Sequence, residues 1–600
     1  YVRLFAARVE PPHERSLDVL KGLAWCASLV ERPALRRVLA DAVPSCLKNA
    51  QFLHHHDPDE MYDYTTIGPR APRLANAIIW ALSQMNSLDA VAQLSRVRLR
   101  IRHGGAIKSV ERALGEIAKR LNVAPDDLEE LAVPDFGLEN GVLRRTFGEW
   151  TAEVDFAGRK GVWTWSAEGK KAPKSVPASI KSDFAAELKE MKGQVAEIEK
   201  LPPAHKERLD LLLREEKTWS LAIWRERYLD HPFLSLLARR IIWEWSTTNE
   251  NGQAFLPHGE GWLNERGEAV LHPPEDATIR LWHPNRHDAA TVQSWRRLLE
   301  DKGIQQPFKQ AHREIYPLTE AERQTRTYSN RFAAHIIRQH QFNALCATRG
   351  WKNKLRLMVD DVAPPATKEM PRYNLRAEFW IDGIGDEYAA DTNETGTFLR
   401  LATDQVRFYR MEAPQNFAHV SGGGYAANWR TAPAEPLPLE EIPPLIFSEI
   451  MRDVDLFVGV ASVGNDPTWN DGGPDGRFIN YWQDYSFGEL SATAQTRRDL
   501  LERLVPRLKI AGRCALDGKN LIVRGDLRTY KIHLGSGNIL MEPNDEYLCI
   551  VPDRSAQSGG DRVFLPFEGD QVLSIILSKA FMLSEDKQIT DPTIVRQIKS

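Results

Sequence analysis

The chain has 600 residues, of which 42% are hydrophobic and 27% are charged. This composition is typical of a folded protein with several domains, and it excludes long disordered tails. The 78 basic and 82 acidic residues give a net charge of −4, which excludes an overall field that would attract nucleic acid or an anionic membrane.

The cysteines and the apolar runs indicate the cellular compartment. No run of about 18 apolar residues exists, so we expect no membrane span. The cysteines are scattered and form no CxxC pair, which predicts reduced thiols in a cytoplasmic protein. They are Cys26, Cys46, Cys346, Cys514 and Cys549. Because the chain begins at Tyr1, inside what looks like a structured region, we expect it to be a fragment of a longer protein.

Residues 17–131 have apolar residues at helical spacing and few strand formers. The stretch GLAWCASLVERPALRRVLADAV (22–43) resembles AIIWALSQMNSLDAVAQLSRV (77–97), and the two place Trp25 and Trp80 at the same position. A stack of helix pairs, similar to HEAT repeats, is therefore predicted, with a polar loop between the two units. One more helix is expected to begin at Pro125.

The next segment changes from strands to helices. Alternating residues in TAEVDF and GVWTWSAEG predict a β-meander within 141–180. Heptad-like spacing then predicts a helix from Phe184 to Ile198. Pro202 and Pro203 should break it, and a second helix is expected to continue to Trp219, which gives a helical hairpin.

The remaining elements alternate between strands and helices. Strands are predicted within 255–282 and 374–410, and helices over 288–300, 319–347 and 445–455, the last after the proline-rich connector 431–444. A compact α+β module is predicted over 488–600, with a helix over 493–507, three short strands, an apolar helix from Asp570 and a last helix from Asp591.

The fold class is therefore a multidomain α+β protein. We divide it into a helical repeat-like (HEAT-like) region, a β-meander with a helical hairpin, a mixed α+β core and a C-terminal α+β module. These parts are assigned to residues 1–140, 141–250, 251–430 and 431–600.

Motifs of several well-known enzymes are missing. The sequence contains no GxxxxGK[ST], no HExxH and no GxSxG. The acidic run 465–478 is not an EF-hand, because Asp471 stands where glycine is required and Arg477 where a glutamate is needed. Gly535-Ser536-Gly537-Asn538 suggests a phosphate loop, but Pro543 leaves no room for the helix that must follow. A β-hairpin is predicted there, and we expect no cofactor.

Several histidines are close enough in sequence to be candidate metal ligands. His54, His55 and His56 precede Asp57 and Asp59, residue types that suit zinc or iron, but three consecutive side chains point in different directions. The other pairs are more loosely spaced and fit surface or core histidines better. They are His283 with His287 and His335 with His340. No metal site is predicted.

Two clusters remain as candidate sites. The series Arg96, Arg98, Arg100 and Arg102 could contact phosphates of nucleic acid, although a solvated helix surface explains it as well. In the run SEIMRDVDLFVGV (448–460), Asp453 and Asp455 follow Arg452, and Asp466 comes later. These carboxylates are candidate catalytic groups, or members of an ion-pair network.

The stretch IQQPFKQAHREIY (304–316) also joins polar with apolar residues, and Pro307 is expected to open a helix there. Together with HPNRHDAATVQSW and the later YKIHLGSGNILMEPNDEYLCIVP, it resembles the bacterial MolR-like family that contains the domain of unknown function 4132. The motif YKIHLGSGNILMEPNDEYLCIVP resembles the module that ends long members of that family. The resemblance implies a large cytoplasmic protein and no known catalytic residue. Some members carry a WGR domain, which is not evident here.

Three functions follow as hypotheses. The first is a non-enzymatic regulatory or scaffolding protein that binds protein partners, because repeat-like helices and 17 Trp accompany balanced charge. The second is a nucleic-acid-associated regulator that uses the arginine series. The third is an unrecognised enzyme with a polar site in 448–475.

Overall fold

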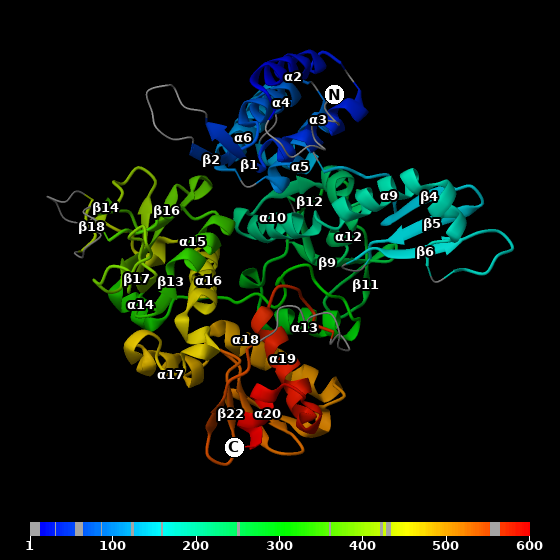
Figure 1. Cartoon of the computed structure of the whole chain (residues 1–600). Helices are drawn as coiled ribbons and strands as arrows, with labels where there is room; N and C mark the ends of the chain where they lie inside the picture. The colour runs from blue at the N-terminus through cyan, green and yellow to red at the C-terminus, as the bar shows by residue number, and fades with distance from the viewer. Residues whose placement is uncertain are drawn as a thin grey trace. The chain divides into compact units, whose positions relative to one another are not determined.

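The computed structural model (Figure 1) describes most of the chain, and its residues fall into two compact units. Unit 1 comprises Tyr1–Lys206, Trp219–Arg239 and Pro273–Ile279, and unit 2 comprises Glu207–Thr218, Arg240–His272 and Arg280–Ser600. The described residues are 12–30, 32–54, 64–85, 87–101, 103–121, 125–131, 133–157, 160–173, 175–248, 252–358, 362–419, 424–427, 434–551 and 564–599. In these ranges, no helix is long and apolar enough to cross a bilayer.

Unit 1 begins with a group of helices around one apolar core, as predicted. Helices α2, α4 and α6 pack side by side in one row, and α3, α5 and α7 in a second row. They are α2 (Glu14–Ala27), α3 (Pro33–Cys46), α4 (Pro72–Gln84), α5 (Leu88–Arg100), α6 (Gly104–Leu121) and α7 (Pro125–Leu131). Two rows of helices are the arrangement that stacked helix pairs give. They support the HEAT-like repeat, which stays a prediction.

The expected polar loop between α3 and α4 is wrong for part of its length. Strand β1 (Asn49–His54) pairs with β2 (Tyr64–Pro69) in an antiparallel ladder whose register joins Asn49 to Pro69. Pairing of the two backbones supplies the hydrogen bonds here. The hydrophobic periodicity that predicted the helices carries no signal for such a short hairpin.

The predicted β-meander is present as a four-stranded antiparallel sheet in the order β3-β4-β5-β6. Its strands are β3 (Leu138–Glu139), β4 (Val142–Phe147), β5 (Trp150–Asp155) and β6 (Val162–Ser166). Helices α8 (Ala178–Asp183) and α9 (Ala185–Ile198) follow, and α10 (Pro202–Glu215) begins at the two prolines. The second predicted helix is too long, since Trp219 lies in strand β7 (Thr218–Ser220). Short turns complete unit 1, namely α11 (Leu221–Trp224), the π-helix Arg225–Leu229 and α12 (Ser235–Ala238).

Unit 2 contains the predicted strands of 255–282, except for the part at Pro273–Ile279, and the predicted helix α13 (Ala289–Asp301). Strands β8, β9, β10 and β11 form consecutive antiparallel pairs. They are β8 (Trp243–Ser246), β9 (Gln253–His258), β10 (Gly261–Leu263) and β11 (Ala269–Val270), and β12 (Thr278–Leu281) follows them in sequence.

The continuous helix predicted over 319–347 is wrong. Helix α14 (Glu320–Thr325) starts with a capping box of Thr319 and Glu322 and ends after one turn and a half. Arg326 has a φ of 65°, a left-handed conformation that stops a helix. Strand β13 (Ile336–Arg338) and helix α15 (Gln339–Thr348) follow.

A second antiparallel sheet, in the order β13-β17-β16-β15, forms the centre of unit 2. Leu375, Ala377 and Phe379 of β16 belong to one apolar core with Ile450 and Phe457 of helix α16. The elements are β15 (Ala366–Met370), β16 (Leu375–Gly383), β17 (Arg400–Arg410) and α16 (Pro444–Ala461), beside the small pair β14 (Val362–Ala363) and β18 (Ala418–His419). Both the predicted sheet and the predicted helix are confirmed.

The C-terminal α+β module is confirmed in its element types. A five-stranded antiparallel meander packs with helices α18 and α19 around one core, with α19 against β20 and β21 and α20 against β23. Its elements are α18 (Ala492–Leu504), β19 (Cys514–Asp517), β20 (Asn520–Arg524), β21 (Thr529–His533), β22 (Ile539–Met541), β23 (Glu546–Leu548), α19 (Gln571–Ser584) and α20 (Pro592–Lys599), preceded by α17 (Ile479–Phe487). The Gly-Ser-Gly-Asn stretch joins β21 to β22 as the predicted hairpin, with Gly537 at a φ of 75°.

Candidate functional site

The polar segment 304–316 lies inside unit 2, and the helix predicted from Pro307 is wrong. The segment is irregular, yet almost all of it is buried. A side-chain amide holds it against backbone groups of other segments. Gln310 donates from Nε2 to the carbonyls of Ile242 (2.7 Å) and Trp282 (2.9 Å), and its Oε1 accepts from the N–H of Ile242 at 2.8 Å. The segment is thereby fixed to the neighbouring strand.

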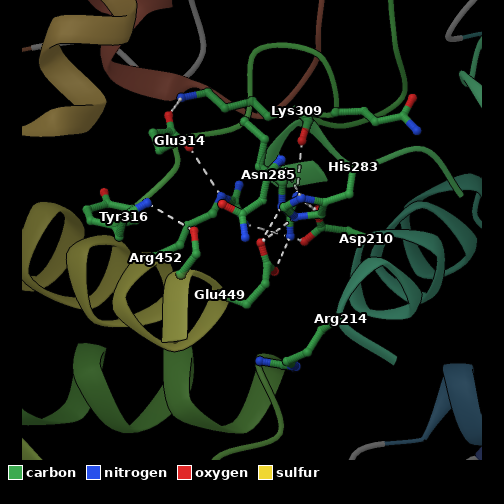
Figure 2. A network of polar contacts seen from close by, with 12 residues as sticks. Asp210, Arg214, His283, Asn285, Lys309, Glu314, Tyr316, Glu449 and Arg452 are labelled. Carbon is green, nitrogen blue, oxygen red and sulfur yellow. Dashed lines mark hydrogen bonds and ion pairs between the residues drawn. The ribbon is translucent and has the colours of Figure 1, made fainter. Parts of the chain in front are cut away.

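Arg313 of this segment belongs to a buried ionic network, of which Figure 2 labels Asp210, His283 and Glu449. Its Nε and Nη2 each donate to one carboxylate oxygen of Glu449 on α16, both at 2.6 Å, and its Nη1 donates to Asp210 on α10. His283 lies on the other side of Glu449, with Nε2 3.1 Å from Oε1. Because Nδ1 of His283 accepts the N–H of Asn285 at 3.0 Å, Nε2 carries the proton and donates to Glu449.

Asp453, one helical turn after Glu449, forms the second half of the network. Arg349 donates from Nε to Oδ1 at 2.7 Å, and Arg214 donates from Nη1 to Oδ2 at 2.9 Å. The indole Nε1 of Trp351 donates to Oδ2 at 2.9 Å. Arg349 also donates from Nη1 to Asp210 at 2.5 Å, so that Asp210 joins the two halves.

A third group of contacts extends the network toward the C-terminal module. Lys309 donates to Glu314 at 2.7 Å and lies 3.0 Å from Asp570, the N-cap residue of α19. Arg452 donates from Nε to Glu314 at 3.2 Å, and Figure 2 shows both side chains at one end of the network. Segments distant in sequence are thus held by charge pairs inside a single unit.

The charges in this network are fixed at neutral pH. Burial opposes ionisation of Glu449 and Asp453, but the neighbouring arginines outweigh it and hold the pKa of each carboxyl below its usual value. Burial likewise opposes the charge of Glu314, while Lys309 and Arg452 lower its pKa to about 2. A carboxylate that stays ionised and paired exchanges no protons near pH 7, and its pairing favours a structural role for Asp453.

Asp455 has different surroundings from Asp453. It lies on α16, is buried, and accepts hydrogen bonds from the hydroxyl of Tyr316 (2.6 Å) and from Thr493. Burial raises its pKa, and the two hydroxyls compensate only in part. Asp466 is in a third environment, where it caps a turn by accepting from Thr468 N at 3.0 Å and pairs with Arg338 at 2.5 Å. The three candidate carboxylates thus contact different partners, and their catalytic role stays a prediction.

The arginine series lies at the end of α5, and its described members have acidic partners. Arg96 is 6% exposed and pairs with Asp41 and Glu197. Arg100 donates to Asp41 at 2.7 Å, and Arg98 lies 3.4 Å from Glu111. Arg102 lies outside the described residues. These pairs favour the solvated, ion-paired surface over a phosphate site.

The structure gives the surroundings of some of the histidines considered as metal ligands. The side chains of His54, His55 and His56 lie outside what the structure describes. In the described ranges, no group of three or more His, Cys, Asp or Glu residues could hold a metal ion. His283 instead donates to Glu449, and His335 lies with Nδ1 3.3 Å from the hydroxyl of Tyr481.

Sequence reasoning missed an exposed apolar face on α2. Two stripes with helical spacing run along this helix. The inner stripe is Leu17, Leu20, Ala24 and Ala27, and all four belong to or pack on the core of unit 1. The outer stripe is Val19, Leu23 and Cys26, and all three are exposed, as is Val30 just after the helix.

Large aromatic and aliphatic side chains border the outer stripe. Trp25 is 47% exposed and Trp80 of α4 is 48% exposed, and their rings meet edge to face at 6.4 Å. Leu29, just after α2, is 85% exposed. A helix that is apolar on opposite sides usually packs on both. The signal was visible in the sequence as two interleaved apolar stripes.

Two families match parts of the chain. Residues 169–351 match the family described as Domain of unknown function (DUF4132), and residues 494–598 match Domain of unknown function (DUF7737). The first match covers α9, α10 and the segment of Arg313, and the second covers the C-terminal module. The resemblance to DUF4132 is therefore confirmed, and the MolR-like label stays a prediction.

One relative is similar over a shorter length. The chain is 28% identical over 254 residues to "Uncharacterized protein YehI" of Escherichia coli (strain K12), which is 40% of this chain and 20% of that protein. This chain thus spans only a small part of that relative in the matched region. No solved structure is similar.

Proposed function

We propose that the protein is a non-enzymatic regulatory or scaffolding protein that acts by binding another protein. The observation that carries this proposal is the outer stripe of α2 together with the exposed Trp25 and Trp80. Exposed apolar surface of this kind marks interaction sites, and tryptophan is enriched among the residues that dominate binding energy.

The position of α2 adds support. Helix α2 packs on α4, which packs on α6, so α2 is the end of its row among the described helices. An apolar outer face on a helix is what a binding surface requires.

The buried ionic network supports a non-enzymatic role for unit 2. Its carboxylates are paired with arginine or lysine, and burial of the strongest pair is complete, with Arg313 0% and Glu449 1% exposed. Such a network specifies how segments meet. Nucleic-acid binding through Arg96 to Arg102, and an enzyme site in 448–475, remain alternative hypotheses. The cytoplasmic location and the four-part domain division remain proposals as well.

Affinity purification with matched variants tests the proposal. The full chain is compared with the double variant Leu23→Asp and Leu29→Asp, and with a control that carries Leu271→Asp and Val162→Asp. Leu271 and Val162 are 90% and 60% exposed and lie outside α2. We expect at least one protein to be recovered at least tenfold less with the double variant and unchanged with the control. Equal recovery of every protein with all three chains would refute the proposal.

A further inference from the structure

We draw no further inference here: the strongest candidate, the exposed apolar face of α2 beside Trp25 and Trp80, already carries the proposed function, and nothing in the structure shows what covers it.

Discussion

Arg313 and Glu449, which are 136 residues apart in sequence, meet through two parallel hydrogen bonds of 2.6 Å in the interior of unit 2. A bidentate pair of this kind fixes the direction as well as the distance between two groups. Arg313 lies in an irregular segment and Glu449 in α16, so the pair determines where the segment runs along the helix. Its role is specific positioning, since burial of two charges costs free energy that their attraction must offset.

Removal of one partner should therefore destabilise unit 2 strongly. We expect Arg313→Met to lower the free energy of unfolding by about 3–5 kcal/mol, because Glu449 is then left buried with its main partner removed. Arg507→Met is the control, since its pair with Asp301 is exposed and is worth at most about 1 kcal/mol. Chemical denaturation followed by circular dichroism measures both. Equal effects of the two substitutions would contradict a structural role for the network.

Acid should weaken the network over a defined range of pH. Glu314 has a pKa of about 2 in the folded chain, where burial is outweighed by Lys309 and Arg452, against about 4.3 for an unfolded glutamate. A lowered folded pKa gives stability that is present above the unfolded pKa and is lost as the pH falls through the folded one. The melting temperature should hence fall from about pH 5 toward pH 2. The variant Glu314→Gln should show a shallower fall, and an identical pH profile would contradict the assignment.

The elements that the sequence predicted well are those with a strong local signal. The meander of 141–180, helix α16 and the hairpin at Gly535 to Asn538 follow from alternation, periodicity and turn residues. The hairpin β1–β2 and the break at Arg326 have no such signal, because they depend on backbone pairing and on one left-handed residue. The hairpin and the break could therefore be found only from the structure.

The candidate site was visible only in fragments. The sequence marked Asp453 and Asp455 and left open whether they were catalytic or paired. Their partners Arg214 and Arg349 lie 239 and 104 residues away from Asp453, and a periodic pattern carries no information about such distances. The Pro307 segment was predicted as a helix because its apolar residues have helical spacing. Gln310 overrides that tendency with three hydrogen bonds to Ile242 and Trp282.

The two aspartates of α16 should respond to the same change by very different amounts. Asp453→Asn removes the charge that compensates Arg214 and Arg349, and we expect a loss of about 3–5 kcal/mol of stability. Asp455→Asn removes a charge that burial disfavours, while the amide oxygen still accepts from Tyr316 and Thr493, so a change within about 1 kcal/mol is expected. Thermal unfolding of both variants measures this. The hypothesis of an enzyme site in 448–475 also fails if folded Asp455→Asn leaves the cellular phenotype intact.

The arginine series offers a test of the nucleic-acid hypothesis. Arg96 is buried and shares Asp41 with Arg100, so Arg96→Gln should destabilise the helical group of unit 1. Arg98 is more exposed than Arg96, and its Nη2 lies 3.4 Å from Oε1 of Glu111. An exposed pair of this kind contributes little, so Arg98→Glu should leave the fold unchanged. We expect Arg98→Glu to have no effect on binding to mixed DNA and RNA in a filter assay at low salt. Phosphate contacts would instead give binding that weakens steeply with salt and falls in this variant, since each contact releases counterions. That outcome would favour nucleic-acid binding over the scaffolding role.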